Sequence, residues 1–252
     1  MDVWEANSRA TVFTPHTCSG EGLFLCNTPD ECARTTGVCD KSGCGVNPFA
    51  QGARGFYGPG GAVDTSRPFT VVTQFLSDDG TDRGELAEIR RVYVQDGRAV
   101  TQAAVRNETV DALETGLGAV TQDFCVGKNS TDFLRLGGLP GMGESLARGM
   151  VLIMSIWNSP GDFMEWLDQA PAGPCNATEG DPVNIQKRQP DASVVFSNIR
   201  WGDIGSTVRV MPNGTVQLAA VVELSGAPTT GFEGWTMARM ALVAAFGYLL
   251  VL

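Results

Sequence analysis

The stretch that decides the fold is Met1-Asp2-Val3-Trp4-Glu5-Ala6-Asn7-Ser8, where the 252-residue sequence begins. Its residues favour a β-strand, and a strand turns alternate side chains to the same face. Asp2 and Glu5 lie an odd number of positions apart, so their carboxylates share a face only if a β-bulge inserts one residue between them. A carboxylate at the position just before Met1 would share the face of Asp2.

Such a group of carboxylates suits a retaining glycosidase. In these enzymes one carboxylate attacks the sugar, and a second, about 5 Å away, acts first as acid and then as base. A third carboxylate, hydrogen-bonded to the nucleophile, sets the nucleophile's pKa and rotamer. The alternative is a solvated strand edge, where paired acids are common, and this stretch alone does not decide between the two.

The composition excludes several classes of function. The formal net charge of −10 argues against nucleic-acid binding, which needs basic patches. The single histidine, His16, and the lack of any C-x-x-C motif argue against a structural zinc site, so we expect neither metal nor cofactor. The 31 glycines suit an all-β protein with many turns and bulges.

The cysteines and glycosylation motifs indicate a secreted protein. Five of the seven cysteines lie between Cys18 and Cys44, a density typical of disulfide-stapled loops in secreted domains. Asn-x-Ser/Thr acceptors support this compartment, and they occur at Asn107, Asn129, Asn176 and Asn213. No signal peptide precedes Met1, so we expect Met1 to be an internal methionine of an exported protein.

The remaining pattern predicts strands separated by long loops. Residues 8–61 are loop-like and residues 101–138 form a long loop with room for one helical turn. The continuous apolar run 150–157 predicts a strand buried on both faces. Trp4 is expected behind the catalytic strand and Trp201 in the core. The other expected strands and hairpins cover residues 69–76, 89–94 with 98–100, 193–201 and 207–217. This pattern, with almost no helical periodicity, predicts a β-sandwich.

The sequence changes character from residue 222. Small residues at 225–227 are followed by a mostly polar spacer, residues 228–239, and by the apolar run 240–252. That run is too short to span a bilayer comfortably, and the pattern is typical of a glycosylphosphatidylinositol-anchor signal with attachment at Ser225 or Gly226. A tail-anchor helix and a buried C-terminal helix are the alternatives. The expected organisation is therefore a domain over 1–221, an attachment site and spacer over 222–239, and an anchor signal over 240–252.

The opening stretch resembles the Glu-x-Asp-x-x-Glu signature of glycoside hydrolase family 7, the fungal retaining β-1,4-glucanases and cellobiohydrolases. The family motifs TPH-x-C, C-D-x-x-G-C-x-x-N-P-[FY] and [FY]-YGPG follow in the same order. The resemblance covers about residues 1–206 and implies the C-terminal half of a concanavalin-like β-jelly roll, a sandwich of two curved antiparallel sheets. It implies that Glu5 is the acid/base and that Asp2 assists a nucleophile immediately before Met1.

The same resemblance assigns substrate contacts. It implies that Trp157 and Trp166 are glucose platforms on either side of the cleavage point, where core packing is the alternative. It places His16 in the cleft near the carboxylates, where a lone polar residue capped by a disulfide loop is the alternative. It gives Arg34 a contact with the leaving-group sugars, where an exposed charge is the alternative.

The resemblance also implies the disulfide pairing. It joins Cys18 to Cys39, Cys26 to Cys32 and Cys44 to Cys125, and it leaves Cys175 to a partner upstream.

The short segment between Trp166 and Cys175 resembles the endoglucanase branch, whose short loops leave an open cleft. We therefore expect a monomeric, extracellular, lipid-anchored endo-β-1,4-glucanase that acts with retention on cellulose or a related β-glucan. The alternatives are a cellobiohydrolase that releases cellobiose from chain ends, and a non-catalytic β-glucan-binding protein of the cell wall. We expect the 252 residues alone to be inactive without the nucleophile, and we consider that they do not fold on their own.

Overall fold

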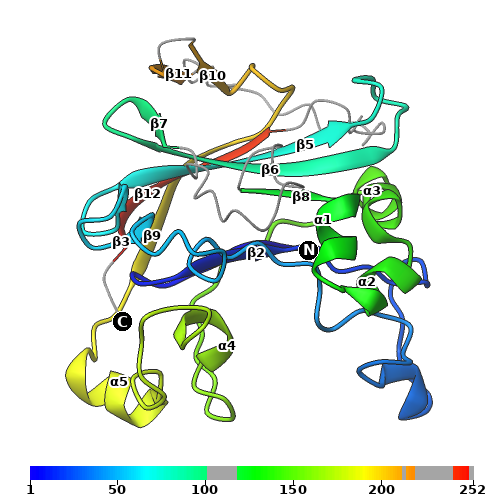
Figure 1. The fold of residues 1–252 in the computed structure, drawn as a ribbon, viewed down its shortest axis with the longest axis horizontal. Coiled ribbons are helices and arrows are strands. Elements are labelled where there is room, and N and C mark those ends of the chain that lie inside the picture. Colours follow the sequence, from blue (N-terminus) through cyan, green and yellow to red (C-terminus); the bar gives the residue numbers. More distant parts are fainter. Residues whose placement is uncertain (101–117, 212–213, 219–240, 250–252) are drawn as a thin grey trace, which may run out of the picture.

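The computed structural model describes residues 1–100, 118–211, 214–218 and 241–249. The chain is mostly β-structure with a few short helices (Figure 1). This agrees with the predicted dominance of β-strands.

The largest element is an antiparallel sheet of six strands in the order β7-β6-β5-β12-β9, with β8 also paired to β6. Its longest pairing joins β5 to β6. Both strands contain β-branched and aromatic residues, which favour β-structure. The strands expected over 69–76, 89–94, 98–100 and 193–201 are confirmed. The six strands are β5 (Phe69–Ser77), β6 (Leu86–Gln95), β7 (Arg98–Val100), β8 (Ala119–Thr121), β9 (Val194–Arg200) and β12 (Ala241–Leu249).

Three small ribbons complete the β-structure. The hairpin of β1 (Asp2–Ala6) and β2 (Thr11–Thr14) runs across one face of the large sheet (Figure 1). Strand β2 corrects the loop expected over residues 8–61, since its buried residues pair with β1. The expected hairpin over 207–217 is confirmed. The other two ribbons are the parallel pair β3 (Tyr57–Gly58) with β4 (Val63–Asp64) and the antiparallel pair β10 (Val208–Val210) with β11 (Val216–Leu218).

The helices cluster at one end of the sheet and at the base of the molecule (Figure 1). The expectation of a long loop is wrong for residues 118–138, which form β8, α1, α2 and the start of α3; residues 101–117 lie outside the described part. The Thr121 hydroxyl accepts the Phe124 N–H and so caps α1. The helices are η1 (Asp30–Cys32), α1 (Gln122–Gly127), α2 (Thr131–Arg135), α3 (Gly138–Ala147), α4 (Glu165–Asp168) and α5 (Pro182–Arg188).

Two apolar clusters attach the β1–β2 hairpin to the large sheet. In the first, Phe13 of β2 packs with Ile89 of β6 and with Phe133, Leu139 and Met142 from α2 and α3, all of them fully or almost fully buried. Burying a side chain of this size stabilises the fold by about 1.5–3 kcal/mol.

The second cluster contains Tyr57, Phe69 and Tyr93, whose rings meet edge-on or tilted with centroids 5.9 Å apart. Trp4 joins it through an edge contact with Phe69 at 6.2 Å, so it packs behind the strand that carries Asp2 and Glu5, as expected. The hairpin is thereby fixed against the sheet from both ends.

The expected buried strand over 150–157 is wrong. The segment forms no strand, and its side chains are exposed, Val151 by 86% and Ile153 by 79%. A continuous apolar run forms a buried strand only when it pairs within a sheet and other layers cover both faces of that sheet, and none of the described strands pairs with it. Trp201 is 58% exposed, so its expected place in the core is also wrong.

The end of the chain forms the strand β12 between β5 and β9. The tail-anchor helix and the buried C-terminal helix, the two alternatives for residues 240–252, both require helical backbone. Residues 241–249 form a strand instead. The anchor signal itself remains a prediction, because Ser225, Gly226 and the whole segment 222–239 lie outside the described residues. Within the described part, no helix has the length and apolar character needed to cross a membrane.

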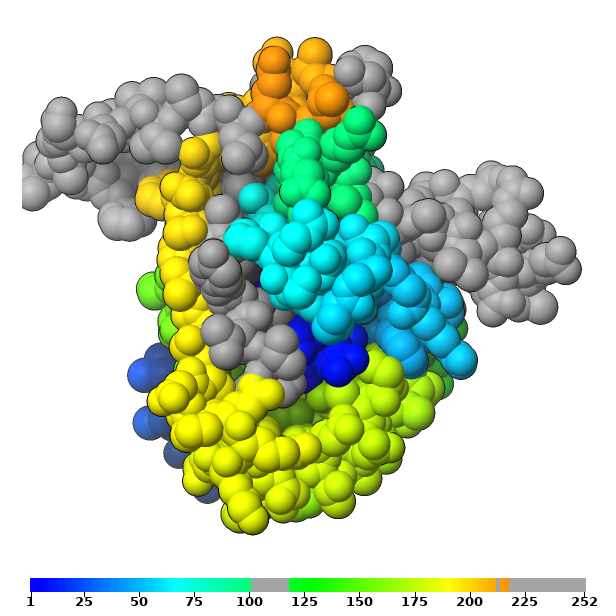
Figure 2. Space-filling model, turned by 90° about the vertical axis from the view of Figure 1, so that its left-hand side faces the viewer, coloured from blue at the N-terminus to red at the C-terminus, as the bar shows by residue number. Residues whose placement is uncertain are grey.

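A side view separates the two ends of the molecule (Figure 2). The segment that contains α5 lies at the base, and the hairpin of β10 and β11 lies at the opposite end. The β1–β2 hairpin lies between them, beneath the large sheet.

Candidate active site

A β-bulge brings the two predicted catalytic carboxylates to one face. Asp2 pairs with Thr14 and Glu5 pairs with Val12, so three steps along β1 correspond to two steps along β2. Thr14 and Val12 point to the same side of their strand, and directly paired residues share a face. Asp2 and Glu5 therefore project from the same face, and the bulge that the sequence required is confirmed.

Asp2 is hydrogen-bonded to His16. The Nε2 of His16 lies 2.8 Å from Oδ2 of Asp2. This hydrogen bond lowers the pKa of Asp2, against the opposing effect of partial burial. The Asp2 side chain is 44% exposed, so the ionised carboxylate also remains open to a ligand.

Glu5 is shifted in the opposite direction. Burial, helped by the negative charge of Asp2, raises the pKa of Glu5 to about 7. A carboxyl group of this kind is protonated in mildly acidic solution and can release its proton near neutrality, as a general acid that later acts as base requires. Two neighbouring carboxylates whose pKa values are pushed apart are a sign of divided acid and base roles.

Asp40 holds the other side of His16, a contact that the sequence analysis missed. The Nδ1 of His16 lies 3.2 Å from the Asp40 carbonyl oxygen and 3.9 Å from its Oδ2. The Asp40 side chain is buried, and its Oδ1 accepts the backbone N–H groups of Ser42 and Gly43, each at 2.9 Å. The sequence offered one signal for the role of Asp40, which directly follows a cysteine within a family motif.

Three disulfides stabilise this wall of the site. They join Cys18 to Cys39, Cys26 to Cys32 and Cys44 to Cys125, the pairs that the resemblance implied. The first bond links the segment after His16 to the segment that carries Asp40. It therefore fixes the two halves of the His16 environment to each other.

Cys175 is a free thiol within the described part of the chain. Burial, with the nearby carboxylate of Asp168, raises the pKa of Cys175 to about 12, so the thiol is a poor nucleophile. Its predicted upstream disulfide partner remains a prediction. Asp168 also accepts a hydrogen bond of 2.6 Å from Asn7 and so ties α4 to the end of β1.

Trp157 and Trp166 stack on one another. Their ring centroids are 6.3 Å apart with an interplanar angle of 20°, and the residues are 51% and 42% exposed. This spacing is that of rings in direct contact, so a pyranose would stack on an outer face of the pair. The structure thus places together the two rings that the resemblance assigned to separate subsites, and their substrate roles remain predictions.

The comparison with known protein families covers the residues that form this site. The model of glycosyl hydrolase family 7 matches residues 1–208. The chain belongs to glycoside hydrolase family 7.

Two curated relatives are named as endoglucanases. The endo-beta-1,4-glucanase celB of Aspergillus oryzae is 55% identical over 211 residues, which are 83% of this chain and 48% of that protein. The endoglucanase type C of Fusarium oxysporum is 47% identical over 212 residues, or 83% and 47% of the two chains. The chain spans about half the length of the curated relatives it matches.

Two solved structures agree. An endoglucanase I complexed with cellobiose is 44% identical with a TM-score of 0.66, and the alignment covers 75% of this chain and 46% of that one. The native endocellulase EGI of Humicola insolens is 45% identical with the same TM-score and the same coverage.

The remaining predicted positions that the structure describes are at the surface. Arg34 is exposed and makes no hydrogen bond or ion pair with another described residue. Asn129 and Asn176 are exposed, and Asn107 and Asn213 lie outside the described residues. Within the described part, His, Cys, Asp and Glu side chains form no cluster of three that could hold a metal ion.

Proposed function

We propose that the whole protein is a retaining endo-β-1,4-glucanase that acts on cellulose or a related β-glucan. The observation that carries the proposal is the bulge in β1, which sets Asp2 and Glu5 on one face with pKa values shifted in opposite directions. This division of roles is the one that glycoside hydrolysis by paired carboxyl groups requires.

In this proposal Glu5 donates its proton to the departing glycosidic oxygen. The nucleophile is a carboxylate that precedes Met1 in the whole protein and shares the face of Asp2, and it forms a glycosyl–enzyme ester. Glu5, now ionised, takes a proton from water, which attacks the anomeric carbon and releases the sugar with its original configuration. Asp2, which His16 holds in place, shares a face with the nucleophile and sets its pKa and rotamer.

We further propose that the described strands form part of a jelly-roll sandwich completed by the half of the domain that this chain does not span. Two observations support this. The apolar residues 150–154 are exposed, and the Cys175 thiol has no disulfide partner in the described part. Strands from the other half of the domain would bury these apolar residues, and a cysteine in that half would pair with Cys175.

Endo-action is favoured over release of cellobiose from chain ends. The segment between Trp166 and Cys175 is short, so it cannot roof the cleft. The relatives at 47–55% identity are named endoglucanases, whereas the cellobiohydrolase of Daphnia pulex is 33% identical. An open cleft admits an internal stretch of a polysaccharide.

The test uses these 252 residues joined to the part of the domain that the relatives carry outside the match; this protein is called the whole-domain enzyme below. We expect it to lower the viscosity of a soluble cellulose derivative before many reducing ends appear. Glu5→Gln should abolish hydrolysis, and the exposed Glu21→Gln should not. Cellobiose as the first product would indicate a cellobiohydrolase, and glucan binding without hydrolysis would indicate a binding protein. The 252-residue chain alone should be inactive.

We also propose that the protein is glycosylated, monomeric and held at the cell surface by a lipid anchor. The small residues at 225–227, the spacer and the apolar run support the anchor. Cleavage after Ser225 or Gly226 would remove β12, so the anchored form and the form with β12 exclude one another. Phosphatidylinositol-specific phospholipase C should release activity from intact cells of the source organism, and activity that stays with the cells would contradict the anchor.

A further inference from the structure

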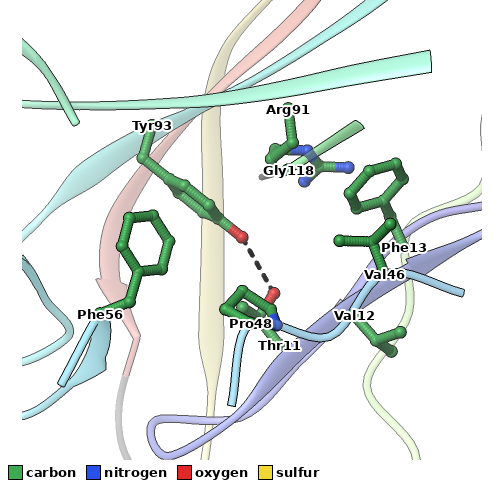
Figure 3. A pocket seen from close by; sticks show the side chains of 9 residues that line it. All are labelled: Thr11, Val12, Phe13, Val46, Pro48, Phe56, Arg91, Tyr93 and Gly118. Carbon is green, nitrogen blue, oxygen red and sulfur yellow. Dashed lines mark hydrogen bonds between the residues drawn. The ribbon is translucent and has the colours of Figure 1, made fainter. Parts of the chain in front are cut away.

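Arg91 is a buried cation that faces the catalytic strand from the large sheet. It lies on β6 and is 5% exposed. Its Nη2 donates a hydrogen bond to the carbonyl oxygen of Val3, which lies on β1. Figure 3 shows the guanidinium beside Phe13, in the pocket between β6 and the β1–β2 hairpin.

Val3 belongs to the bulge. The register between β1 and β2 shifts between Asp2 and Glu5, so Val3 lies within the stretch that carries the extra residue. A bulge leaves a residue outside the regular ladder, and its polar backbone groups need another partner. Arg91 supplies a donor to the Val3 carbonyl.

The guanidinium is also held against β2. Its carbon lies 4.7 Å from the ring centre of Phe13 and 5.9 Å from that of Tyr93. Phe13 is the residue between Val12 and Thr14, the pairing partners of Glu5 and Asp2. The Tyr93 hydroxyl lies 3.0 Å from the Thr11 hydroxyl, a contact drawn in Figure 3.

Fold stability alone does not account for a cation at this position. Burial lowers the pKa of Arg91, which reflects the cost of removing a charge from water. Its Nε and Nη1 are buried without a hydrogen-bond partner in the described part of the chain. An apolar side chain of similar length would fill the site without these costs.

We propose that Arg91 is a positioning residue for catalysis: it holds the bulge of β1 through the Val3 carbonyl and so keeps Asp2 and Glu5 on one face. This proposal rests on the proposed function for its kinetic consequence. Its structural consequence, the position of Asp2, can be measured without any activity.

The whole-domain enzyme offers a direct structural readout, because the ring of His16 is bonded to Asp2. In Arg91→Met the bulge loses its donor, and the ring ¹⁵N and ¹H signals of His16 should move. The matched control is Arg90→Met, since Arg90 is exposed on the neighbouring position and pairs with Glu88. Unchanged His16 signals in a folded Arg91→Met whole-domain enzyme would overturn the proposal.

The kinetic readout separates positioning from packing. In the whole-domain enzyme, Arg91→Met should lower kcat by about tenfold or more, change KM much less and displace the alkaline limb of the pH–rate profile, since small displacements of catalytic groups are costly. Its melting temperature should stay equal or rise. Activity that falls only in step with thermal stability would show a packing role and contradict the proposal.

A second variant keeps the proposal testable if Arg91→Met does not fold. Arg91→Lys keeps the charge and one donor nitrogen, so it should lie between wild type and Arg91→Met in kcat and in the His16 signals. If the wild-type whole-domain enzyme shows no glucanase activity, the proposed function fails, whereas the His16 signals still decide the role of Arg91. If Arg91→Met does not fold, a folded Arg91→Lys with wild-type kcat and signals would overturn the proposal.

Discussion

His16 bridges Asp2 and Asp40. One ring nitrogen lies 2.8 Å from the Asp2 carboxylate and the other lies 3.2 Å from the Asp40 carbonyl oxygen. Both neighbours accept hydrogen bonds, so the ring is oriented by donation on both sides when both nitrogens carry a proton. The only histidine of the chain is thus bound to one of the two predicted catalytic carboxylates.

Removing this histidine should change the acid limb of the pH–rate profile. The His16 hydrogen bond lowers the pKa of Asp2, so in His16→Asn that pKa should rise and Asp2 should be protonated at a higher pH. In the whole-domain enzyme we expect the acid limb to move upward and kcat to fall about tenfold. Glu21→Gln, an exposed substitution, is the control, and an unmoved acid limb would contradict the assignment of Asp2.

Replacing Glu5 should stabilise the folded enzyme at alkaline pH. The pKa of Glu5 rises from 4.5 to about 7 on folding, so the folded state holds the proton more tightly and loses stability as the pH rises through this window. Glu5→Gln cannot ionise, and it should be more stable than wild type at pH 8 by about 1 kcal/mol, after discounting for partial exposure. At pH 4 the two proteins should be equally stable. Urea denaturation at both pH values measures this difference.

The disulfides should differ in their contribution to stability. Cys44 and Cys125 lie 81 residues apart and join the site wall to α1, whereas Cys26 and Cys32 lie 6 apart in an exposed loop. Closing the longer loop restricts the unfolded chain more. We expect Cys44→Ala with Cys125→Ala to lower the free energy of unfolding by about 4 kcal/mol, and Cys26→Ala with Cys32→Ala by about 2 kcal/mol. Equal losses would contradict this reading.

The stacked tryptophans should contribute to substrate binding. Trp157→Ala removes a ring from the exposed aromatic surface, so KM for soluble glucan should rise about tenfold, the loss expected for an aromatic contact worth about 1–1.5 kcal/mol. Trp166→Ala should have a similar effect. Trp201→Ala, an equally exposed tryptophan that no binding role is assigned to, is the control. An effect as large in the control would argue against a sugar platform.

The β6–β7 hairpin and the bulge in β1 could be predicted because their sequence signals are local. The apolar runs of β5 and β6 indicate strands, and the turn at Asp96-Gly97 indicates the hairpin of β6 with β7. The odd spacing of Asp2 and Glu5 requires a bulge if their carboxylates share a face. The run 150–157 misled the prediction, because a continuous apolar segment marks a strand only when its partners are present.

The contacts around the site were less accessible to sequence reasoning. Arg91 meets Val3 across 88 positions and Asn7 meets Asp168 across 161, so tertiary packing alone brings them together. Helices α1 and α2 are each about one to two turns long, too short to show a clear period.

Glu5 is the proposed acid/base of a retaining glucanase. The most direct test of this assignment is the whole-domain Glu5→Ala enzyme with an aryl β-cellobioside whose leaving group needs no protonation, in the presence of azide. We expect this variant to be inactive on cello-oligosaccharides but to turn over the aryl substrate. With azide it should release the β-glycosyl azide, since the small anion replaces base-assisted water. Undiminished hydrolysis of cello-oligosaccharides, or an α-glycosyl azide as product, would contradict the assignment.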